Sequence, residues 1–275
     1  MTVFYLKALG AIAISLSVLM AMAWVVQQRT GNSGWVDNIW TYSLGLVGAW
    51  GAMFPADGET FTHRQWLVAI LVALWSLRLG GHIAERAAGM KDDARYAEMA
   101  AQWGKEAPRR MFIFLQQQAI ASVPLVFAVF IAAHHPAPGL RAQDYLGALI
   151  LLVAIAGEST ADRQLRAFRA DPANKGKVCE AGLWTYSRHP NYFFEWFGWL
   201  AYPVIAISAG YWWGWLTLLA PLLMYFILVH LTGVPPLEKQ MLESRGDAFR
   251  AYQERTSKFF LLPPFIWRAI SRSAS

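Results

Sequence analysis

The sequence predicts an all-α integral membrane protein with seven transmembrane helices, forming a single domain over residues 1–275. Composition is the first reason, because 56% of the residues are hydrophobic and only 15% are charged, unlike the average soluble domain. The second is that apolar tracts of the roughly 20 residues needed to cross a bilayer recur along the chain. The third is that 20 of the 24 Lys and Arg residues fall in three stretches between those tracts.

The predicted spans are the apolar tracts at residues 4–26, 36–54, 65–83, 111–134, 144–161, 191–209 and 211–231. The first tract also has features of a signal peptide, because Lys7 precedes it and Ala21-Met22-Ala23 is typical of a cleavage site. Its hydrophobicity continues through Val26, which favours an uncleaved first span.

The basic residues predict the orientation. They gather in residues 78–110, 163–188 and 239–272, and two spans separate each stretch from the next. Cytoplasmic loops of membrane proteins are enriched in Lys and Arg, so all three stretches are expected in the cytoplasm. The N-terminus is then outside and the C-terminus inside. This distribution also explains the net charge of +6 without a nucleic-acid partner.

The C-terminal region differs from the spans. Apolar residues recur there among charged neighbours at helical spacing, which is typical of a helix lying in the membrane interface: Leu237, Met241, Leu242, Phe249 and Tyr252. The tract "FFLLPPFIW" that follows contains two prolines and is too short to cross a bilayer. We expect it to fold back against the other helices.

Several chemistries lack their sequence signatures. The chain has no P-loop and no G-x-G-x-x-G after a strand, so a dinucleotide would bind without a Rossmann unit. Its six His residues form neither HExxH nor a dense cluster, so no metal is expected. The single cysteine, Cys179, cannot form an intramolecular disulfide.

Polar side chains inside the spans are the first candidates for a functional site, because an ionisable group at the bilayer centre costs at least about 2.5 kcal/mol. Asp37 and Asn38 lie near one end of the second span, close to Tyr42. Gln116, Gln117 and Gln118 interrupt the fourth span, where interhelical hydrogen bonds explain them as well as substrate contact does.

The fifth span ends in four charged residues at intervals of four, four and three: Glu158, Asp162, Arg166 and Arg169. This spacing predicts one helical stripe running from the membrane into the cytoplasm. A ladder of ion pairs explains most of it, but Glu158 has only the like charge of Asp162 within one turn.

The run "GLWTYSRHPNYFFEW" begins the sixth span at Pro190, after the capping region at Ser187. Arg188 and His189 would lie beside the positive end of that helix, an arrangement suited to a phosphate. They could equally be topology anchors. Asn191 and Glu195, four residues apart, are predicted to share a deeper face.

This run, together with "ADRQLRAFR" and "GVPPLEKQM…YQERTSKFFLLPP", resembles the steroid 5α-reductase family in its bacterial branch, known as domain of unknown function 1295. The resemblance covers about residues 35–265. Isoprenylcysteine carboxyl methyltransferases share a similar RHPxY element, but ADxxLxxFR resembles the nucleotide-contacting helix of the reductases. Family members are seven-span enzymes that bind NADPH on the cytoplasmic side and reduce a C=C bond conjugated to a ketone, as in 3-oxo-Δ4 steroids.

The resemblance implies residue roles. Asp162, Arg166, Arg169 and Lys177 would contact the adenosine and phosphate part of NADPH, and Tyr186, Asn191 and Glu195 would line the nicotinamide end. In the loop at 78–110, Arg86, Arg95 and Tyr96 resemble a segment that closes over the cofactor. The remaining residues expected around NADPH are Glu158, where vertebrate members have Asn, and Arg188, His189 and Tyr192.

The resulting hypothesis is NADPH-dependent reduction of an apolar, steroid-like enone in a bacterial inner membrane, at a site open to the cytoplasm. Asp37, with Asn38 and Tyr42, is expected to polarise or protonate the ketone, because a carboxyl group at membrane depth can remain protonated. Vertebrate 5α-reductases have a Gln-Glu pair here. The alternatives are an S-adenosylmethionine-dependent methyltransferase and a small transporter or assembly protein.

Overall fold

A computed structural model of the chain describes residues 2–55, 60–88 and 92–273. The structure is 81% helical and has no strand among the residues it describes, which confirms the predicted all-α class. The chain divides into two compact units. Unit 1 comprises residues 1–148 and 202–220, and unit 2 comprises residues 149–201 and 221–275.

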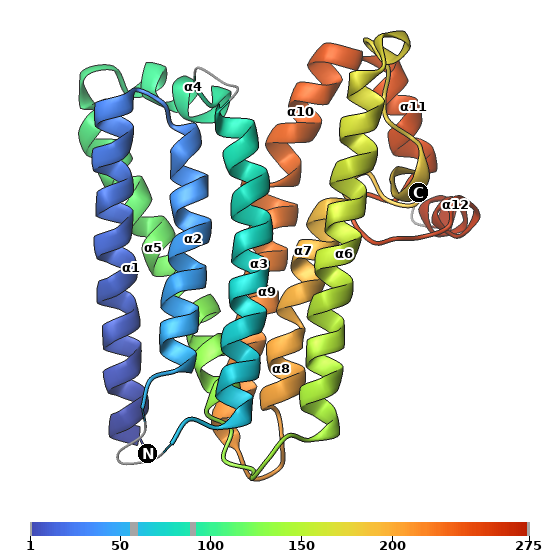
Figure 1. The fold of residues 1–275 in the computed structure, drawn as a ribbon. Helices are drawn as coiled ribbons and strands as arrows, with labels where there is room; N and C mark the ends of the chain where they lie inside the picture. The colour runs from blue at the N-terminus through green and yellow to red at the C-terminus, as the bar shows by residue number, and fades with distance from the viewer. Residues whose placement is uncertain (1, 56–59, 89–91, 274–275) are drawn as a thin grey trace. The chain divides into compact units, whose positions relative to one another are not determined.

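Unit 1 is built on four long helices that lie side by side (Figure 1): α1 (Thr2–Thr30), α2 (Gly34–Ala52), α3 (His63–Ala88) and α5 (Ala107–Ala133). The short helix α4 (Ala94–Trp103) contacts α5. Unit 1 also contains the start of α6 (Ala142–Ala170), most of α8 (Ala201–Ala206) and a 3₁₀ helix (Trp212–Leu218).

Glycines of α2 let α3 approach closely. A Cβ added at Gly45 would lie 2.1 Å from Oγ of Ser76, and one at Gly48 would lie 3.1 Å from Val72. Small residues at this spacing allow helix backbones to pack closely in a membrane. The α2 residues before Gly45 and after Gly48 are therefore held close to α3.

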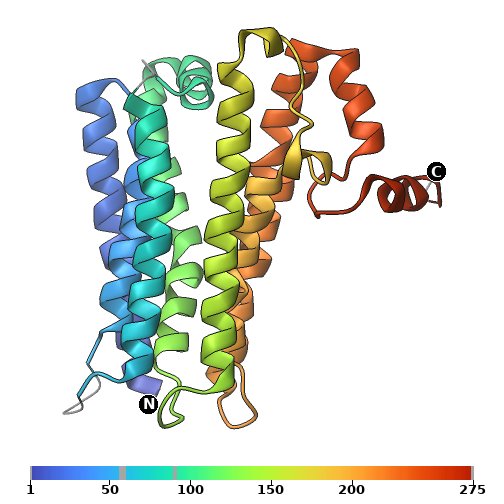
Figure 2. The same cartoon turned by 45° about the vertical axis from the view of Figure 1, so that its right-hand side comes forward.

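Unit 2 contains the rest of α6 with α7 (Pro190–Trp199), most of α9 (Leu219–Phe226), a π-helical turn (Ile227–Leu231), α10 (Val234–Arg245), α11 (Asp247–Arg255) and α12 (Pro264–Ser273). Gly157 of α6 lies under the Phe194 ring of α7, where an added Cβ would lie only 2.4 Å from a ring carbon. Figure 2 shows α12 lying across the direction of α6 and α10.

Within the described residues, five helical stretches are long and apolar enough to cross a membrane: Thr2–Thr30, His63–Ala88, Arg95–Ala133, Ala142–Ala170 and Trp212–Arg245. They support the predicted membrane protein. The predicted spans at 36–54 and 191–209 are not among the five. The first of these corresponds to α2, and the second is divided between α7 and α8 at Leu200.

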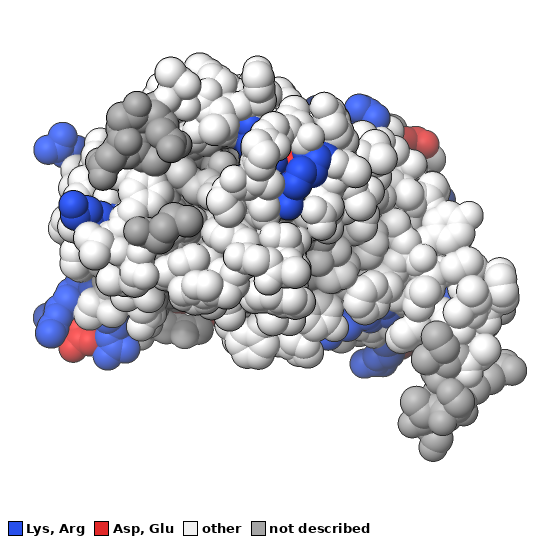
Figure 3. All heavy atoms as spheres, turned by 90° about the horizontal axis from the view of Figure 1, so that it is seen from below, with Lys and Arg blue, Asp and Glu red and all other residues white. Residues whose placement is uncertain are grey.

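The two ends of unit 1 differ in charge. The basic stretch at 78–110 covers the end of α3, α4 and the start of α5, at the end of unit 1 away from the start of α1 (Figure 1). Seen from the end where α1 begins, uncharged side chains make up most of the face, and Lys and Arg show as small separate groups (Figure 3).

Three segments differ from the predicted elements. The loop expected at 78–110 contains the last turns of α3 and all of α4. The single interfacial helix expected near the C-terminus is two helices, because Gly246 at φ +51° ends α10. In "FFLLPPFIW", Phe259 packs back on Phe193 and Trp196 of α7 as predicted, but α12 begins at Pro264 and Phe265 is 73% exposed.

Candidate functional site

The polar residues predicted on α6 and α7 are buried within unit 2. Glu158, Asp162 and Glu195 are between 5% and 7% exposed. Asn191 Nδ2 donates to Asp162 Oδ1 at 3.3 Å, and Trp199 Nε1 donates to Glu195 Oε1 at 2.9 Å. The structure therefore brings Asp162 and Asn191 together, although the resemblance assigns them to different ends of NADPH, and their roles toward a cofactor stay predictions.

The basic residues that follow on α6 leave this buried region. Arg166 and Arg169 are exposed, one and two turns beyond Asp162. Lys177 is also exposed, and its carbonyl accepts from Arg245 Nε at 3.4 Å. Tyr186 is 43% exposed. The stripe predicted from the spacing thus runs from buried acids to exposed guanidinium groups.

Arg188 and His189 are held by the C-terminal helices of unit 2. Arg188 Nε donates to Glu238 Oε1 at 2.7 Å, and its Nη1 donates to the carbonyls of Gln253 and Thr256 at 3.1 and 2.6 Å. His189 Nε2 lies 3.1 Å from the same Glu238 oxygen. In this structure Arg188 therefore fastens α10 and α11 to the start of α7, and its role toward phosphate stays a prediction.

The start of α7 is further fixed by its neighbours. Ser187 Oγ accepts from the His189 backbone N–H at 3.1 Å and donates to the Phe259 carbonyl at 2.8 Å. The rings of His189 and Tyr192 stack with centroids 5.7 Å apart. Burial lowers the pKa of His189 despite the opposing effect of Glu238, so the ring is neutral at pH 7.

A second group of predicted residues meets in unit 1, where α4 covers the start of α2. Tyr96 donates its hydroxyl proton to Asp37 Oδ1 at 2.7 Å, and Arg95 Nη2 donates to Asp37 Oδ2 at 2.5 Å. Gln118 Nε2 of α5 donates to the Tyr96 oxygen at 3.4 Å. Asp93 binds Arg95 through both carboxylate oxygens, at 2.8 and 3.0 Å. We call these five residues the Arg95 cluster.

One atom of the Arg95 cluster is unsatisfied. Gln118 Oε1 is buried and has no hydrogen-bond partner among the described residues. A buried polar atom without a partner indicates strain, an ordered water or a ligand. The Arg95 cluster is also partly open, because the side chains of Arg95 and Asp37 are 41% and 23% exposed.

The other predicted catalytic residues contact α3. Asn38 Nδ2 donates to the Gly80 carbonyl at 2.7 Å. The Tyr42 ring packs on Gly80 so closely that a Cβ added there would lie 2.6 Å from the nearest ring carbon. Both contacts pack α2 on α3, and a catalytic role for either residue stays a prediction. Arg86 is exposed at the end of α3, near enough to Asp93 to lower its pKa slightly.

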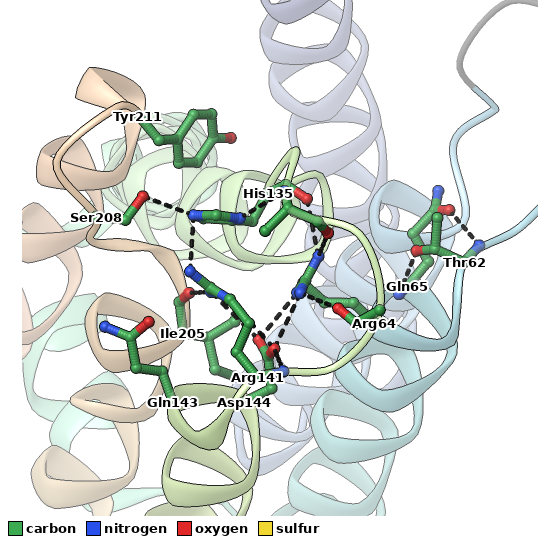
Figure 4. Close-up of polar contacts among 12 residues, drawn as sticks. Thr62, Arg64, Gln65, His135, Arg141, Gln143, Asp144, Ile205, Ser208 and Tyr211 are labelled. Atoms are coloured by element: carbon green, nitrogen blue, oxygen red, sulfur yellow. Dashed lines mark hydrogen bonds and ion pairs between the residues drawn. The ribbon is translucent and has the colours of Figure 1, made fainter.

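At the opposite end of unit 1, side chains drawn in Figure 4 form a second polar cluster. Arg64, His135 and Asp144 are 2%, 7% and 0% exposed, and Arg141 is 20% exposed. Arg64 Nε and Nη2 bind Asp144 at 2.9 and 3.0 Å, and Arg64 also donates to the carbonyls of His135, Ala137 and Gly139. Arg141 contacts Asp144 and donates to His135 Nε2 at 2.9 Å. We call Arg64, His135, Arg141 and Asp144 the Arg64 cluster.

In the Arg95 cluster and around the start of α7, sequence reasoning missed Asp93 and Glu238. The sequence does indicate a role for Asp93, because Asp directly before an amphipathic run is a favoured N-cap of a helix. Gln118 was noted among three glutamines, and the structure shows why: Gln118 binds Tyr96, whereas Gln116 accepts from Ser17 Oγ at 2.6 Å. No sequence pattern indicates Glu238, because its partner Arg188 lies 50 residues away in the chain.

Comparison with known proteins identifies the family. Residues 23–256 match the family described as Protein of unknown function (DUF1295). The chain belongs to this family. DUF1295 includes steroid 5α-reductase-like proteins. No curated protein and no solved structure matches the chain. The DUF1295 match includes every residue of the Arg95 cluster and the polar residues of α6 and α7. No group of three metal-binding side chains occurs among the described residues.

Proposed function

We propose that the protein is a membrane-bound, NADPH-dependent reductase of a C=C bond conjugated to a ketone. The observation that carries the proposal is the hydrogen bond from the Tyr96 hydroxyl to Asp37, which lies in the first turn of α2. Membership in a family that includes steroid 5α-reductase-like proteins supports it. A proton donor beside membrane-spanning helices suits an apolar substrate with one polar end, because the apolar part can stay among the helices while the polar end meets the donor.

The reaction adds a hydride to the β-carbon of the enone and a proton to the α-carbon. Negative charge accumulates on the ketone oxygen between these events, so a hydrogen-bond donor to that oxygen lowers the barrier. Asp37 accepts from both Tyr96 and Arg95, so the proton between Tyr96 and Asp37 lies on Tyr96. We assign to this hydroxyl the hydrogen bond to the ketone oxygen, which it makes by turning from Asp37 Oδ1 as charge develops, and the proton added to the α-carbon comes from solvent. Asp37 orients the hydroxyl, and Gln118 supports its oxygen.

The residues of unit 2 fit a phosphorylated dinucleotide by their chemistry. Arg166 and Arg169 are exposed guanidinium groups, the side chains best suited to phosphate oxygens. The pair of buried Asp162 and half-buried Asn191 offers hydrogen bonds to a ribose or an amide. These residues would hold NADPH, which supplies the hydride when bound. Their own task is to bind and orient it and to exclude water.

The proposal includes a topology of seven spans. To the five stretches named above it adds α2 and the pair of α7 and α8 as membrane-crossing segments, with the N-terminus outside and the C-terminus in the cytoplasm. The basic stretch at the α4 end of unit 1 supports this orientation. The site would then open to the cytoplasm of a bacterial cell, where NADPH is made.

Cofactor binding tests the proposal first. NADPH should raise the midpoint of thermal unfolding of the detergent-solubilised protein, because a ligand that binds only the folded state stabilises it. Replacing Arg166 and Arg169 by Ala should weaken this effect, whereas Arg250→Ala, which removes an exposed guanidinium of α11, should not. Stabilisation by S-adenosylmethionine instead of NADPH would contradict the proposal and favour a methyltransferase.

Turnover tests it second. The protein with NADPH should convert a 3-oxo-Δ4 steroid, or another flat apolar enone, to its saturated ketone. Asp37→Asn should lower kcat, because the amide cannot accept a hydrogen bond from Tyr96 as strongly as a carboxylate does. A panel of enones left unchanged by NADPH-bound protein would overturn the assignment.

A further inference from the structure

Two adjacent carboxylates, Asp92 and Asp93, order the segment that leads into α4, and the first of them holds this segment to the start of α2. Asp92 Oδ1 accepts from the backbone N–H of Ser33 at 2.7 Å and from that of Asp93 at 2.8 Å. Ser33 precedes α2, and Asp37 lies in the first turn of that helix. The first carboxylate therefore fixes the backbone of the two segments that carry Asp37 and Tyr96.

The second carboxylate, Asp93, fixes a side chain. Its Oδ1 accepts from both the backbone N–H and Nε of Arg95, each at 3.0 Å, and its Oδ2 accepts from Nη2 at 2.8 Å. Asp93 is only 6% exposed. A bidentate contact of this kind restricts the guanidinium plane as well as its position.

The guanidinium held by Asp93 is the one that reaches Asp37. Arg95 Nη2 lies between Asp93 Oδ2 at 2.8 Å and Asp37 Oδ2 at 2.5 Å. The other oxygen of Asp37 accepts from Tyr96, the residue next to Arg95. Any rotation of the Arg95 side chain would change the orientation of the Asp37 carboxylate and with it the direction of the Tyr96 hydroxyl.

We propose that Asp93 is a positioning residue for the Tyr96–Asp37 proton donor and that it acts through Arg95. This inference rests on the proposed function, since it assigns Asp93 a task in that reaction. The hydrogen bonds that the Asp93 side chain makes among the described residues are with Arg95, and not with Asp37 or Tyr96. Its contribution is the geometry of the donor.

Asp93 remains ionised over the range in which the enzyme would work. Burial opposes ionisation, but the contacts with Arg95 outweigh it and lower the pKa of Asp93 below its ordinary value of 3.8. The ion pair and hydrogen bonds between Asp93 and Arg95 therefore persist unchanged from pH 5 upward. Loss of activity in that range would come from other groups.

Asp93→Asn separates this role from helix capping. Asn is as good an N-cap as Asp, so the contact to the Arg95 backbone N–H can persist, whereas the side-chain NH₂ cannot accept from the guanidinium. We expect kcat to fall by about tenfold to a hundredfold with a much smaller change in KM, as small misplacements of reacting groups typically cause. Asp171→Asn is the matched control, because Asp171 caps a short helix of unit 2 without binding an arginine side chain in the contacts described.

A double-mutant cycle tests whether Asp93 acts through Arg95. Arg95→Gln alone should lower kcat to a similar extent, and adding Asp93→Asn to it should lower kcat no further. Equal losses from Asp93→Asn with and without Arg95 would contradict the proposal, as would wild-type kcat in Asp93→Asn. The same cycle in the midpoint of thermal unfolding should show coupling between the two residues, whether or not the enzyme turns over.

The two measurements distinguish the possible failures. Coupling in thermal unfolding without any enone reduction by the wild-type protein would overturn the proposed function, and the assignment of Asp93 to that reaction with it. Turnover by the wild-type protein with unchanged kcat in Asp93→Asn would overturn only the role of Asp93. An additive loss of thermal stability would show that the bidentate contact is not formed.

Discussion

The two ends of unit 1 each carry an arginine bound by aspartates, and the two clusters differ in their access to solvent. In the Arg64 cluster, Arg64 and Asp144 are 2% and 0% exposed. In the Arg95 cluster, Arg95 and Asp37 are 41% and 23% exposed. The Arg95–Asp37 pair is the more accessible of the two, so we assign a structural role to the same pairing at the Arg64 end and the proposed chemistry to it at the Arg95 end.

The two clusters also differ in how completely their polar atoms are hydrogen-bonded. The Arg64 guanidinium binds a carboxylate and the carbonyls of one loop, so its donors are occupied by the protein itself. The Arg95 cluster keeps a buried oxygen of Gln118 without a partner. The donors of Arg64 tie segments of unit 1 together, whereas the buried Gln118 oxygen indicates strain, an ordered water or a ligand.

Arg64→Ala should have the largest effect on stability. It would leave the fully buried Asp144 carboxylate with Arg141 alone and would release the loop carbonyls, and breaking a buried pair typically costs about 3–5 kcal/mol. Thermal unfolding in detergent measures the loss. Arg250→Ala, which removes the exposed pair with Asp247, is the control and should change little. A wild-type midpoint for Arg64→Ala would remove the contrast between the clusters.

Tyr96→Phe should have the largest effect on activity. Removing a positioned proton donor typically lowers kcat by about a hundredfold or more. The ring would still pack against Phe114, with which Tyr96 makes an edge contact, so the fold should persist. Steady-state kinetics with NADPH and an enone measure the change. Unaltered kcat in this variant would exclude Tyr96 as the donor.

Acidification should weaken the Arg64 cluster through His135. Burial, Arg141 and Arg64 lower the pKa of His135 to about 4, below its ordinary value of 6.5. Between those values the unfolded chain binds a proton at this ring that the folded chain does not, so stability is lost as the pH falls from about 6.5 to about 4. His189 contributes in the same direction, since its pKa is also lowered.

His135→Gln isolates that contribution. Gln can accept from Arg141 without titrating, so the midpoint of thermal unfolding should fall less steeply with decreasing pH than in the wild-type protein. The groups facing the ring are Arg141, Arg64, Asp144 and Tyr211. An identical pH dependence in the variant would show that the Arg64 cluster does not sense acid.

Tyr42→Phe should have the smallest effect. The contact described for Tyr42 is made by its ring over Gly80, so removing the hydroxyl should change stability by no more than about 0.5 kcal/mol and leave kcat near wild type. Kinetics of this variant beside Tyr96→Phe decide between the two tyrosines. A large loss of kcat in Tyr42→Phe would move the donor from α4 to α2.

Much of the helical structure could be predicted from the sequence, because a long apolar run has few alternatives to a helix in lipid. The predicted spans at 65–83, 111–134 and 144–161 lie almost entirely within α3, α5 and α6. The helix α4 was missed because its ten residues, charged at the start, read as part of a basic loop.

The candidate site was predictable only where it follows helical spacing. The interval from Glu158 to Asp162 and that from Asn191 to Glu195 indicate shared faces, but the contact between Asp162 and Asn191 joins two different helices and could not be read from either interval. Contacts such as Arg188 with Glu238 or Arg95 with Asp37 join distant segments, and no periodicity specifies which segments meet. Those pairs required the fold.

The most direct test of the account is the fate of the transferred hydrogen. Purified protein is incubated with NADPH carrying deuterium at both C4 positions of the nicotinamide and with a 3-oxo-Δ4 steroid, and the product is analysed by mass spectrometry and NMR. We expect a saturated ketone with one deuterium at the former β-carbon and a solvent-derived hydrogen at the α-carbon. Unchanged steroid, or product without deuterium, would contradict the proposed function.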